Sequence, residues 1–196
     1  LDGIPTLLRG TLRKAGYSTA MIGKWHIGQV AGPGRFWDHS VVWDQNLIKG
    51  DWYNDQILSL DGAPGREVPG YSTDVYTRFA TDFIRRKHDK PWLLWLCYNA
   101  SHLPNTTHPR HKDFYTGAEV IAPPHVFGPR PEKPAYMHEW TMFKRAPDGS
   151  PLFANNPLPE VVRAYNRLVS AVDEGVGDIL LSLEESGQLD NTLIIY

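Results

Sequence analysis

A lysine and a histidine follow a short apolar run, at a place where an α/β protein would bind a ligand. The run 18–22 is apolar enough for a buried strand, and Gly23 follows it where the chain is expected to turn. Lys24 and His26 are then expected just past the carboxyl end of the strand, where open α/β sheets form their ligand crevice. Period-two spacing puts these two side chains on one side of an extended segment and Trp25 on the other. A cation and an imidazole placed in this way suit a small anionic substrate.

A second histidine stands in a similar position. The run 92–98 is apolar without alternation, which predicts a central parallel strand covered on both faces. His102 follows it and is expected to face the same crevice. Residue type alone favours an ordinary role, because a lysine after a strand is usually solvated and a histidine near a tryptophan is usually packed.

The elements that must position these residues alternate along the chain. Apolar residues at helical spacing predict three helices, and a strand-like run follows each of them. The helices are expected over 5–16, 72–88 and 159–187, and the strands over 18–22, 92–98 and 192–196. Gly16 and Gly187 are expected to end the first and third helices, and Ser72 or Thr73 to cap the second. This order predicts an α/β fold with a largely parallel sheet and flanking helices.

The two remaining segments are expected to be less regular. Neither 28–71 nor 108–158 shows a sustained period of either kind, although the first is partly β-like. His108 and His111 have a spacing that metal ligands use, but no carboxylate or thiol joins them in register, so surface histidines are favoured over a zinc site. Asp173, Glu174 and Asp178 are expected to form the solvated face of the third helix.

Composition narrows the class of protein. The chain has 196 residues, of which 41% are hydrophobic, enough for the core of one domain or most of one. A net charge of -2, with lysine and arginine spread along the chain, disfavours nucleic acid as a partner. No apolar stretch approaches the roughly 20 residues that span a bilayer. The single cysteine, Cys97, excludes an internal disulfide and is expected to be a buried, inert thiol.

The triplets 99–101 and 105–107 match the N-glycosylation sequon, which arises often by chance.

The stretch 16–28 reads GYSTAMIGKWHIG and resembles the signature of the type I sulfatases, arylsulfatase-like enzymes of the alkaline-phosphatase-like superfamily. Further matches follow in the family's order. They are Lys90-Pro91, His102-x-Pro104, Tyr165 through Asp173-x-x-x-Gly177, and Gly187-x-x-Asp190-Asn191-Thr192. The resemblance covers most of the chain and is weakest over 32–69 and 108–157.

The resemblance implies hydrolysis of a sulfate ester at a calcium ion, with a formylglycine nucleophile made from a Cys or Ser in a Cys/Ser-x-Pro-x-Arg motif. Cys97 is not followed by Pro-x-Arg and is not that precursor. By the resemblance, Lys24 binds sulfate oxygens or the hydroxyl of the nucleophile, His26 holds the second hydroxyl of the nucleophile, and His102 faces the leaving oxygen. Fixed cations and a proton donor suit the charge that develops in sulfuryl transfer.

The resemblance also implies that residues 1–196 are an internal part of a sulfatase catalytic domain. The nucleophile motif and an early Asp pair are expected before Leu1, and an Asp-Asn pair and a further lysine after Tyr196. The chain is therefore expected to hold no calcium ligand and to be inactive alone. Members of the family are often periplasmic, secreted or lysosomal, and no signal segment is recognisable here.

The expected substrate is a small-molecule or carbohydrate sulfate ester. The aromatic residues Trp37, Trp43, Trp52 and Tyr53 are consistent with a sugar-stacking wall or with ordinary packing. Two other functions stay open: a phosphodiester or phosphonate monoester hydrolase of the same superfamily, and a non-catalytic sulfatase-like protein that binds sulfated glycans. The oligomeric state is not indicated.

Overall fold

The computed structural model describes residues 8–26, 36–44, 50–129, 131–137 and 142–196. The chain divides into two compact units, Leu1–Ala100 with Ala171–Tyr196, and Ser101–Ser170. The predicted start of the first helix, near Pro5, and Gly28 of the sulfatase-like stretch lie outside the described residues.

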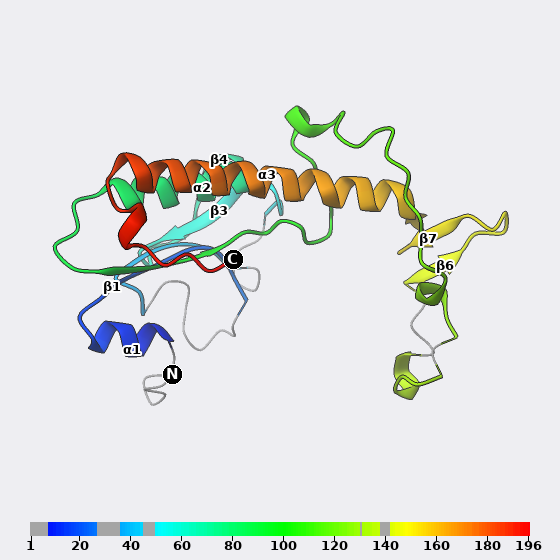
Figure 1. Cartoon of the computed structure of the whole chain (residues 1–196), viewed down its shortest axis with the longest axis horizontal. Coiled ribbons are helices and arrows are strands. Elements are labelled where there is room, and N and C mark those ends of the chain that lie inside the picture. The colour runs from blue at the N-terminus through cyan, green and yellow to red at the C-terminus, as the bar shows by residue number, and fades with distance from the viewer. Residues whose placement is uncertain (1–7, 27–35, 45–49, 130, 138–141) are drawn as a thin grey trace. The chain divides into compact units, whose positions relative to one another are not determined.

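The first unit is built on a five-stranded sheet (Figure 1). Its strands are β1 (Ser18–Trp25), β2 (His39–Asp44), β3 (Asn54–Leu60), β4 (Arg66–Tyr71) and β5 (Trp92–Cys97). Their order is β4-β3-β2-β1-β5. β1 pairs in parallel with β2 and β5, whereas β3 is antiparallel to both of its neighbours. The α/β fold with a largely parallel sheet is therefore confirmed, and the β-like part of 28–71 supplies β2, β3 and β4.

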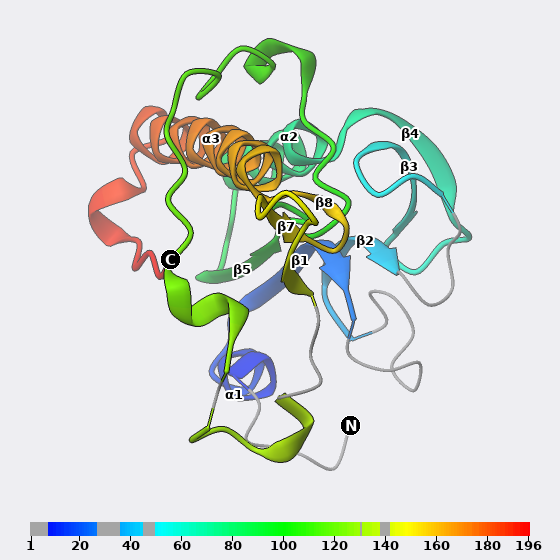
Figure 2. The same cartoon turned by 90° about the vertical axis from the view of Figure 1, so that its right-hand side faces the viewer.

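Helices cover both faces of this sheet. They are α1 (Leu8–Lys14), α2 (Ser72–Arg85) and the later part of α3 (Leu158–Glu185), followed by the short η4 (Leu189–Asn191). Figures 1 and 2 show α2 and α3 on one face and α1 on the other. None of the described helices has the length and apolar content to cross a membrane.

Alternate side chains of β1 belong to two hydrophobic clusters, one on each face of the sheet. Ala20 and Ile22 point to the α2 face and join Trp43 and Tyr76. Met21 and Trp25 point the other way, into a cluster that Val42 completes with partly buried neighbours on the α1 face. Because successive strand residues face opposite sides, a residue two positions after Ile22 belongs to the α2 face.

Two of the predicted helix ends are confirmed. Gly16 (φ +94°) and Gly187 (φ +68°) both adopt the left-handed backbone that glycine allows without a Cβ penalty. After α1 the Tyr17 amide donates to the Leu12 carbonyl, and after α3 the Gln188 amide donates to the Leu183 carbonyl. These bonds satisfy carbonyls that a helix terminus leaves without a partner.

The predicted cap of α2 is wrong. Its N-cap is Tyr71, which makes no side-chain capping bond, and Ser72 and Thr73 lie inside the helix. The reason is that β4 runs directly into α2, so the last strand residue occupies the capping position. The Ser72 amide donates instead to the Tyr53 carbonyl at 2.7 Å.

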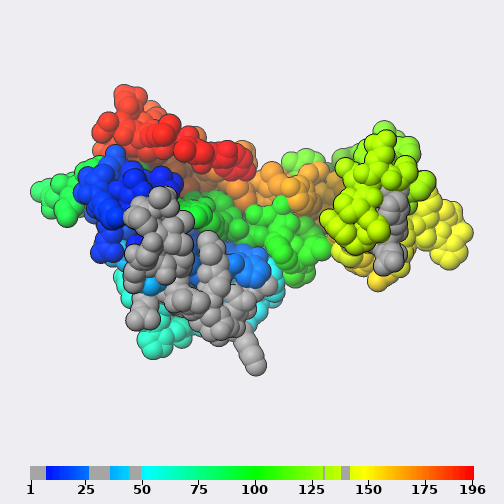
Figure 3. Space-filling model, turned by 90° about the horizontal axis from the view of Figure 1, so that it is seen from below, coloured from blue at the N-terminus to red at the C-terminus, as the bar shows by residue number. Residues whose placement is uncertain are grey.

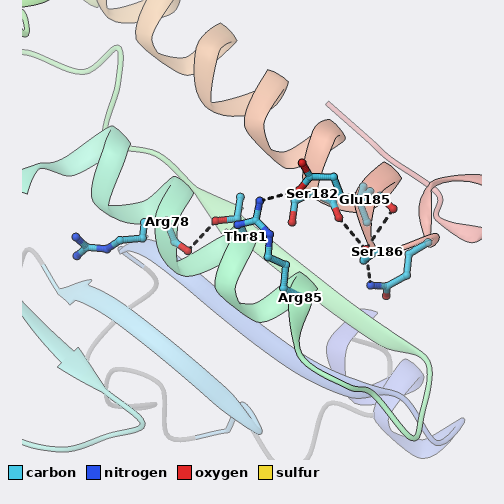
Figure 4. A network of polar contacts seen from close by, with 8 residues as sticks. Arg78, Thr81, Arg85, Ser182, Glu185 and Ser186 are labelled. Carbon is cyan, nitrogen blue, oxygen red and sulfur yellow. Dashed lines mark hydrogen bonds and ion pairs between the residues drawn. The ribbon is translucent and has the colours of Figure 1, made fainter.

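Polar contacts join the end of α2 to the end of α3 (Figure 4). An ion pair links Arg85 and Glu185 at 3.3 Å, although both side chains are about half exposed, so it contributes little. Gln188 makes the more buried link: its amide nitrogen donates to the Ile84 carbonyl at 2.8 Å, and its oxygen accepts from the Trp92 indole at 2.9 Å. The segment after α3 is thereby tied to both α2 and β5.

Two strand predictions are wrong. β5 is at the edge of the described sheet instead of its centre, and its Trp95 is 42% exposed. The segment 192–196 is not a strand, and its Leu193, Ile195 and Tyr196 are exposed. Figure 3 shows the C-terminal part of the chain at the surface, in red. Both runs are apolar enough for a central strand, but sequence does not say how many neighbours a strand pairs with.

The second unit contains short elements and the first half of α3. They are η1 (Pro109–His111), η2 (Pro124–Phe127), η3 (Ala135–Met137), β6 (Phe143–Arg145), β7 (Pro151–Phe153) and β8 (Asn156–Pro157). The three strands form an antiparallel sheet in the order β6-β7-β8. Strands of two or three residues are too short to show a period, which explains why the sequence predicts an irregular segment here.

Candidate active site at the carboxyl end of β1

Lys24 lies near the carboxyl end of β1, but inside the strand. The turn predicted at Gly23 is wrong, because β1 continues to Trp25 and Lys24 stands opposite Trp43 of β2 in the parallel register. Gly23 is needed for another reason. Its φ is +111°, and a Cβ there would lie 1.9 Å from the carbonyl oxygen of Cys97. Glycine at this position therefore lets β1 and β5 approach each other.

The Lys24 ammonium lies over an aromatic face. Its nitrogen is 4.7 Å from the ring centroid of Trp52, a distance typical of a cation–π contact. Partial burial lowers the pKa of Lys24 from its ordinary value, because desolvation disfavours the charged form.

Lys24 and Trp25 follow the predicted alternation. Trp25 is 9% exposed and packs in the cluster on the α1 face, opposite to the side on which Lys24 meets Trp52. His26, directly after the strand, is exposed and so accessible to a ligand. The end of β1 therefore carries a cation and an imidazole two residues apart.

Trp52, whose ring contacts the Lys24 ammonium, is itself held through its ring and through its carbonyl. Its indole packs edge-to-face on Trp43, with ring centroids 5.0 Å apart. Its carbonyl oxygen accepts from the Asn99 amide at 2.7 Å and from the Gln56 amide at 2.8 Å. Trp52 is thus held by residues from β2, from β3 and from the segment after β5.

A buried polar network continues beneath this carbonyl. The Tyr76 hydroxyl donates to the Gln56 oxygen at 2.5 Å and lies 3.2 Å from the Asn99 side-chain oxygen. The Tyr53 hydroxyl donates to the Asn99 carbonyl at 3.4 Å. Burial raises the pKa of both tyrosines far above the ordinary value, so both stay protonated donors. Asn99 is 2% exposed, and this network orders the carboxyl end of β5 beside that of β1.

Sequence reasoning did not find this network. Trp43 and Tyr53 are 2% and 0% exposed, and Trp37 packs on Trp95 and on the cluster on the α1 face, so packing, and not a sugar-stacking wall, explains these three residues. Gln56 and Asn99 carried no spacing signal, because Tyr76 and Asn99 are far from Trp52 and Gln56 in the chain and meet them only in the folded protein. Trp52 lies in the segment 28–71, whose lack of a period left its position unpredicted.

His102 belongs to the second unit and is exposed. Its Nδ1 lies 2.5 Å from the carbonyl oxygen of Leu103, a contact in which a protonated Nδ1 donates. That His102 faces the same ligand as Lys24 and His26 stays a prediction.

Several other titratable groups singled out in the sequence differ in burial. His111 is 0% exposed, so its interpretation as a surface histidine is wrong; its ring packs 5.1 Å from that of Phe114, because the short η1 turns it inward. Asp173, Glu174 and Asp178 are exposed, as predicted. Burial raises the pKa of Cys97, which keeps it an unreactive thiol. Within the described ranges, no group of three or more His, Cys, Asp or Glu side chains is placed to hold a metal ion.

Comparisons with known proteins agree with the fold and with the resemblance to sulfatases. The family model described as Sulfatase matches residues 3–196, and the chain belongs to this family. It is 27% identical to an N-acetylglucosamine-6-O-sulfatase of Bacteroides thetaiotaomicron, over 94% of this chain and 42% of that protein. It is 26% identical to an uncharacterized sulfatase of Escherichia coli, over 100% of this chain and 33% of that protein.

Solved structures show the same fold. A structure in complex with its substrate D-glucosamine-2-N,6-O-disulfate matches with a TM-score of 0.65 and 23% identity, over 94% of this chain and 47% of that chain. A putative sulfatase from Bacteroides fragilis matches with a TM-score of 0.67 and 18% identity, over 94% of this chain and 41% of that chain. The fold is thus that of the alkaline-phosphatase-like sulfatases. The chain spans less than half the length of each of these proteins.

Proposed function

We propose that the complete protein containing this chain hydrolyses sulfate esters, and that Lys24, His26 and His102 belong to its catalytic machinery. The observation that carries this proposal is the Lys24 ammonium at the carboxyl end of a central parallel strand, in a chain of the sulfatase family. Anion-binding groups are expected at this edge of an α/β sheet. This chain alone is proposed to be inactive.

Each proposed role follows from the charge that sulfuryl transfer moves. The ammonium of Lys24 offsets negative charge on the sulfate oxygens, and it does so more effectively in a partly desolvated place than in water. His26 accepts or donates a hydrogen bond at the attacking group. His102 gives a proton to the leaving oxygen, which otherwise departs as a costly alkoxide.

The formylglycine nucleophile and calcium are part of the proposal, and other segments of the complete protein would supply them. The formylglycine would provide the attacking hydroxyl, and a bound calcium ion would provide a positive charge beside the sulfate. The described residues do not form a metal site, so the roles of Lys24, His26 and His102 are derived without one.

We further propose that the substrate is a carbohydrate sulfate ester. The support is that one relative is named an N-acetylglucosamine-6-O-sulfatase and that one structural neighbour is described in complex with a sulfated glucosamine.

The test is turnover of sulfated sugars and an aryl sulfate by the complete protein and its variants. Lys24→Ala and His102→Ala are each expected to lower kcat by roughly 100-fold or more, the loss expected for groups that act on transition-state charge. Lys14→Ala and His125→Ala are matched controls, because both residues are exposed and lie outside the proposed machinery. Thermal unfolding midpoints are expected to change little.

Near-normal turnover by both active-site variants would contradict the catalytic assignment. Hydrolysis of phosphodiesters by a wild-type protein that leaves sulfate esters intact would move the function to the other branch of the superfamily. Binding of sulfated glycans without any turnover would identify a non-catalytic member.

A further inference from the structure

Trp52 makes a cation–π contact with Lys24. The ammonium nitrogen lies 4.7 Å from the indole centroid, and within the described part of the chain Lys24 forms no ion pair. A lysine side chain has four flexible carbon–carbon bonds and presents a point charge, so its ammonium is poorly placed unless a neighbour holds it. The face of an indole is the aromatic surface that attracts a cation most strongly.

We infer that Trp52 is a positioning residue for Lys24, whose indole face holds the ammonium at the carboxyl end of β1 with its N–H groups turned toward the bound anion. This inference rests on the proposed sulfate ester hydrolysis. A ring on one side of the ammonium leaves the opposite side for sulfate oxygens. Trp52 itself touches no reacting atom and acts only through Lys24.

The surroundings of Trp52 suit this role. Its carbonyl is held by Asn99 and Gln56, so the main chain at this position does not depend on the ring. The ring in turn packs against Trp43, which is 2% exposed and stands opposite Lys24 in the parallel register. The element that carries the lysine and the element that supports the indole are therefore neighbouring strands, which keeps the distance between them fixed.

This arrangement allows the ring to be replaced without removing its support. In Trp52→Leu both hydrogen bonds to the carbonyl can be retained, while the site loses the aromatic face and part of the packing on Trp43, which Trp52→Phe restores in part. Trp52→Phe restores a smaller aromatic face. Trp37→Leu is the matched control, because Trp37 also has a cation over its ring, with the Arg9 guanidinium carbon 5.9 Å from the centroid, but joins the cluster on the opposite face of the sheet.

The first measurement is kcat and KM for an aryl sulfate with the complete protein. Trp52→Leu is expected to lower kcat by about 3- to 30-fold, the range that a cation–π contact supports, and to change KM less. Trp52→Phe is expected to recover most of the loss, and Trp37→Leu to keep the kcat of the wild type. Unchanged kcat in Trp52→Leu, or an equal loss in Trp52→Leu and Trp52→Phe, overturns the inference.

The second measurement does not depend on activity. In the complete protein labelled with 13C-lysine, the ε-methylene signal that disappears in Lys24→Gln identifies Lys24. The ring current of Trp52 is expected to shift this signal upfield in the wild type and in Trp37→Leu, but not in Trp52→Leu. A wild-type signal without the shift overturns the inference, whatever the activity. The shift in a wild-type protein that hydrolyses no sulfate ester supports the contact and refutes the proposed function instead.

Discussion

β1 and β5 are neighbouring parallel strands with opposite relations between sequence and burial. β5 reads WLLWLC and has the more continuous apolar run, yet each of its residues is at least partly exposed. β1 reads STAMIGKW and contains a lysine and a glycine, yet the residues from Thr19 to Gly23 are buried. β1 has a partner on each side, whereas β5 pairs with β1 alone among the described strands. Burial here follows the position in the sheet more closely than the hydrophobicity of the strand.

The largest expected loss of stability comes from a substitution at the contact between β1 and β5. Gly23→Ala would place a Cβ 1.9 Å from the Cys97 carbonyl oxygen and force a residue other than glycine to a φ of +111°. We expect the free energy of unfolding to fall by about 4 kcal/mol or more, because the obstacle is backbone that has to move in both strands. Urea denaturation of the complete protein measures this loss.

Gly177→Ala is the control for this substitution. A Cβ at Gly177 meets nothing within 4 Å, and the residue is inside α3, where alanine is expected to stabilise by about 1 kcal/mol. Equal stability of Gly23→Ala and the wild type would show that β1 and β5 are not this close.

A matched pair of truncations tests the difference in burial directly. Ile22 of β1 and Leu96 of β5 stand opposite each other in the register; Ile22 is 0% exposed, and Leu96 is only partly buried. Ile22→Ala is expected to cost about 3–4 kcal/mol and Leu96→Ala about 1–2 kcal/mol, since the cavity left in a closed core adds to the lost burial. The urea midpoints of the two variants measure the difference. A cost for Leu96→Ala that equals or exceeds that for Ile22→Ala would mean that β5 is covered on its other side in the complete protein.

The smallest expected effect is a pH dependence of stability that arises in β2, the other neighbour of β1. His39 at the start of β2 has a lowered pKa, chiefly because of burial, with Arg86 acting in the same direction and Asp61 opposing. The folded state then binds this proton less readily than the unfolded state, so stability is complete above the ordinary pKa of 6.5 and falls as the pH drops through that value. We expect a small effect, because the ring keeps some contact with water.

Thermal unfolding of the wild type and His39→Gln between pH 8 and pH 5.5 measures this dependence. The variant is expected to lose less of its stability on acidification. A steeper loss in His39→Gln would show that the Asp61 pair dominates and that the pKa of His39 is raised.

Local signals predicted the parts of the fold that depend on neighbours in the chain. Gly16 and Gly187 end their helices as expected, because a left-handed residue after an apolar helical run is a local feature. The strand over 18–22 and the opposite orientations of Lys24 and Trp25 were also predicted from the sequence. The continuation of β1 through Gly23 was not, since the positive φ reflects the approach of Cys97 and not a turn.

The candidate site likewise contains residues that local sequence predicts and residues that it does not. Lys24 and His26 were found from their spacing after an apolar run, together with the resemblance to sulfatases. Trp52 as the support for Lys24 was not found, since Lys24 and Asn99 are far from it in the chain and reach it only in the folded protein. Contacts of this kind have no period and no motif.

The burial of Asn99 has a consequence for how the protein is made. Asn99 begins a triplet that glycosylating cells modify during secretion, and the sugar would replace a hydrogen on its amide nitrogen. In the folded protein this nitrogen donates to the Trp52 carbonyl, and the residue is 2% exposed. A glycan attached before folding would therefore keep the end of β5 from docking. Production in a eukaryotic secretory host is expected to lose such chains to quality control, whereas a bacterial host avoids the competition between glycan transfer and folding.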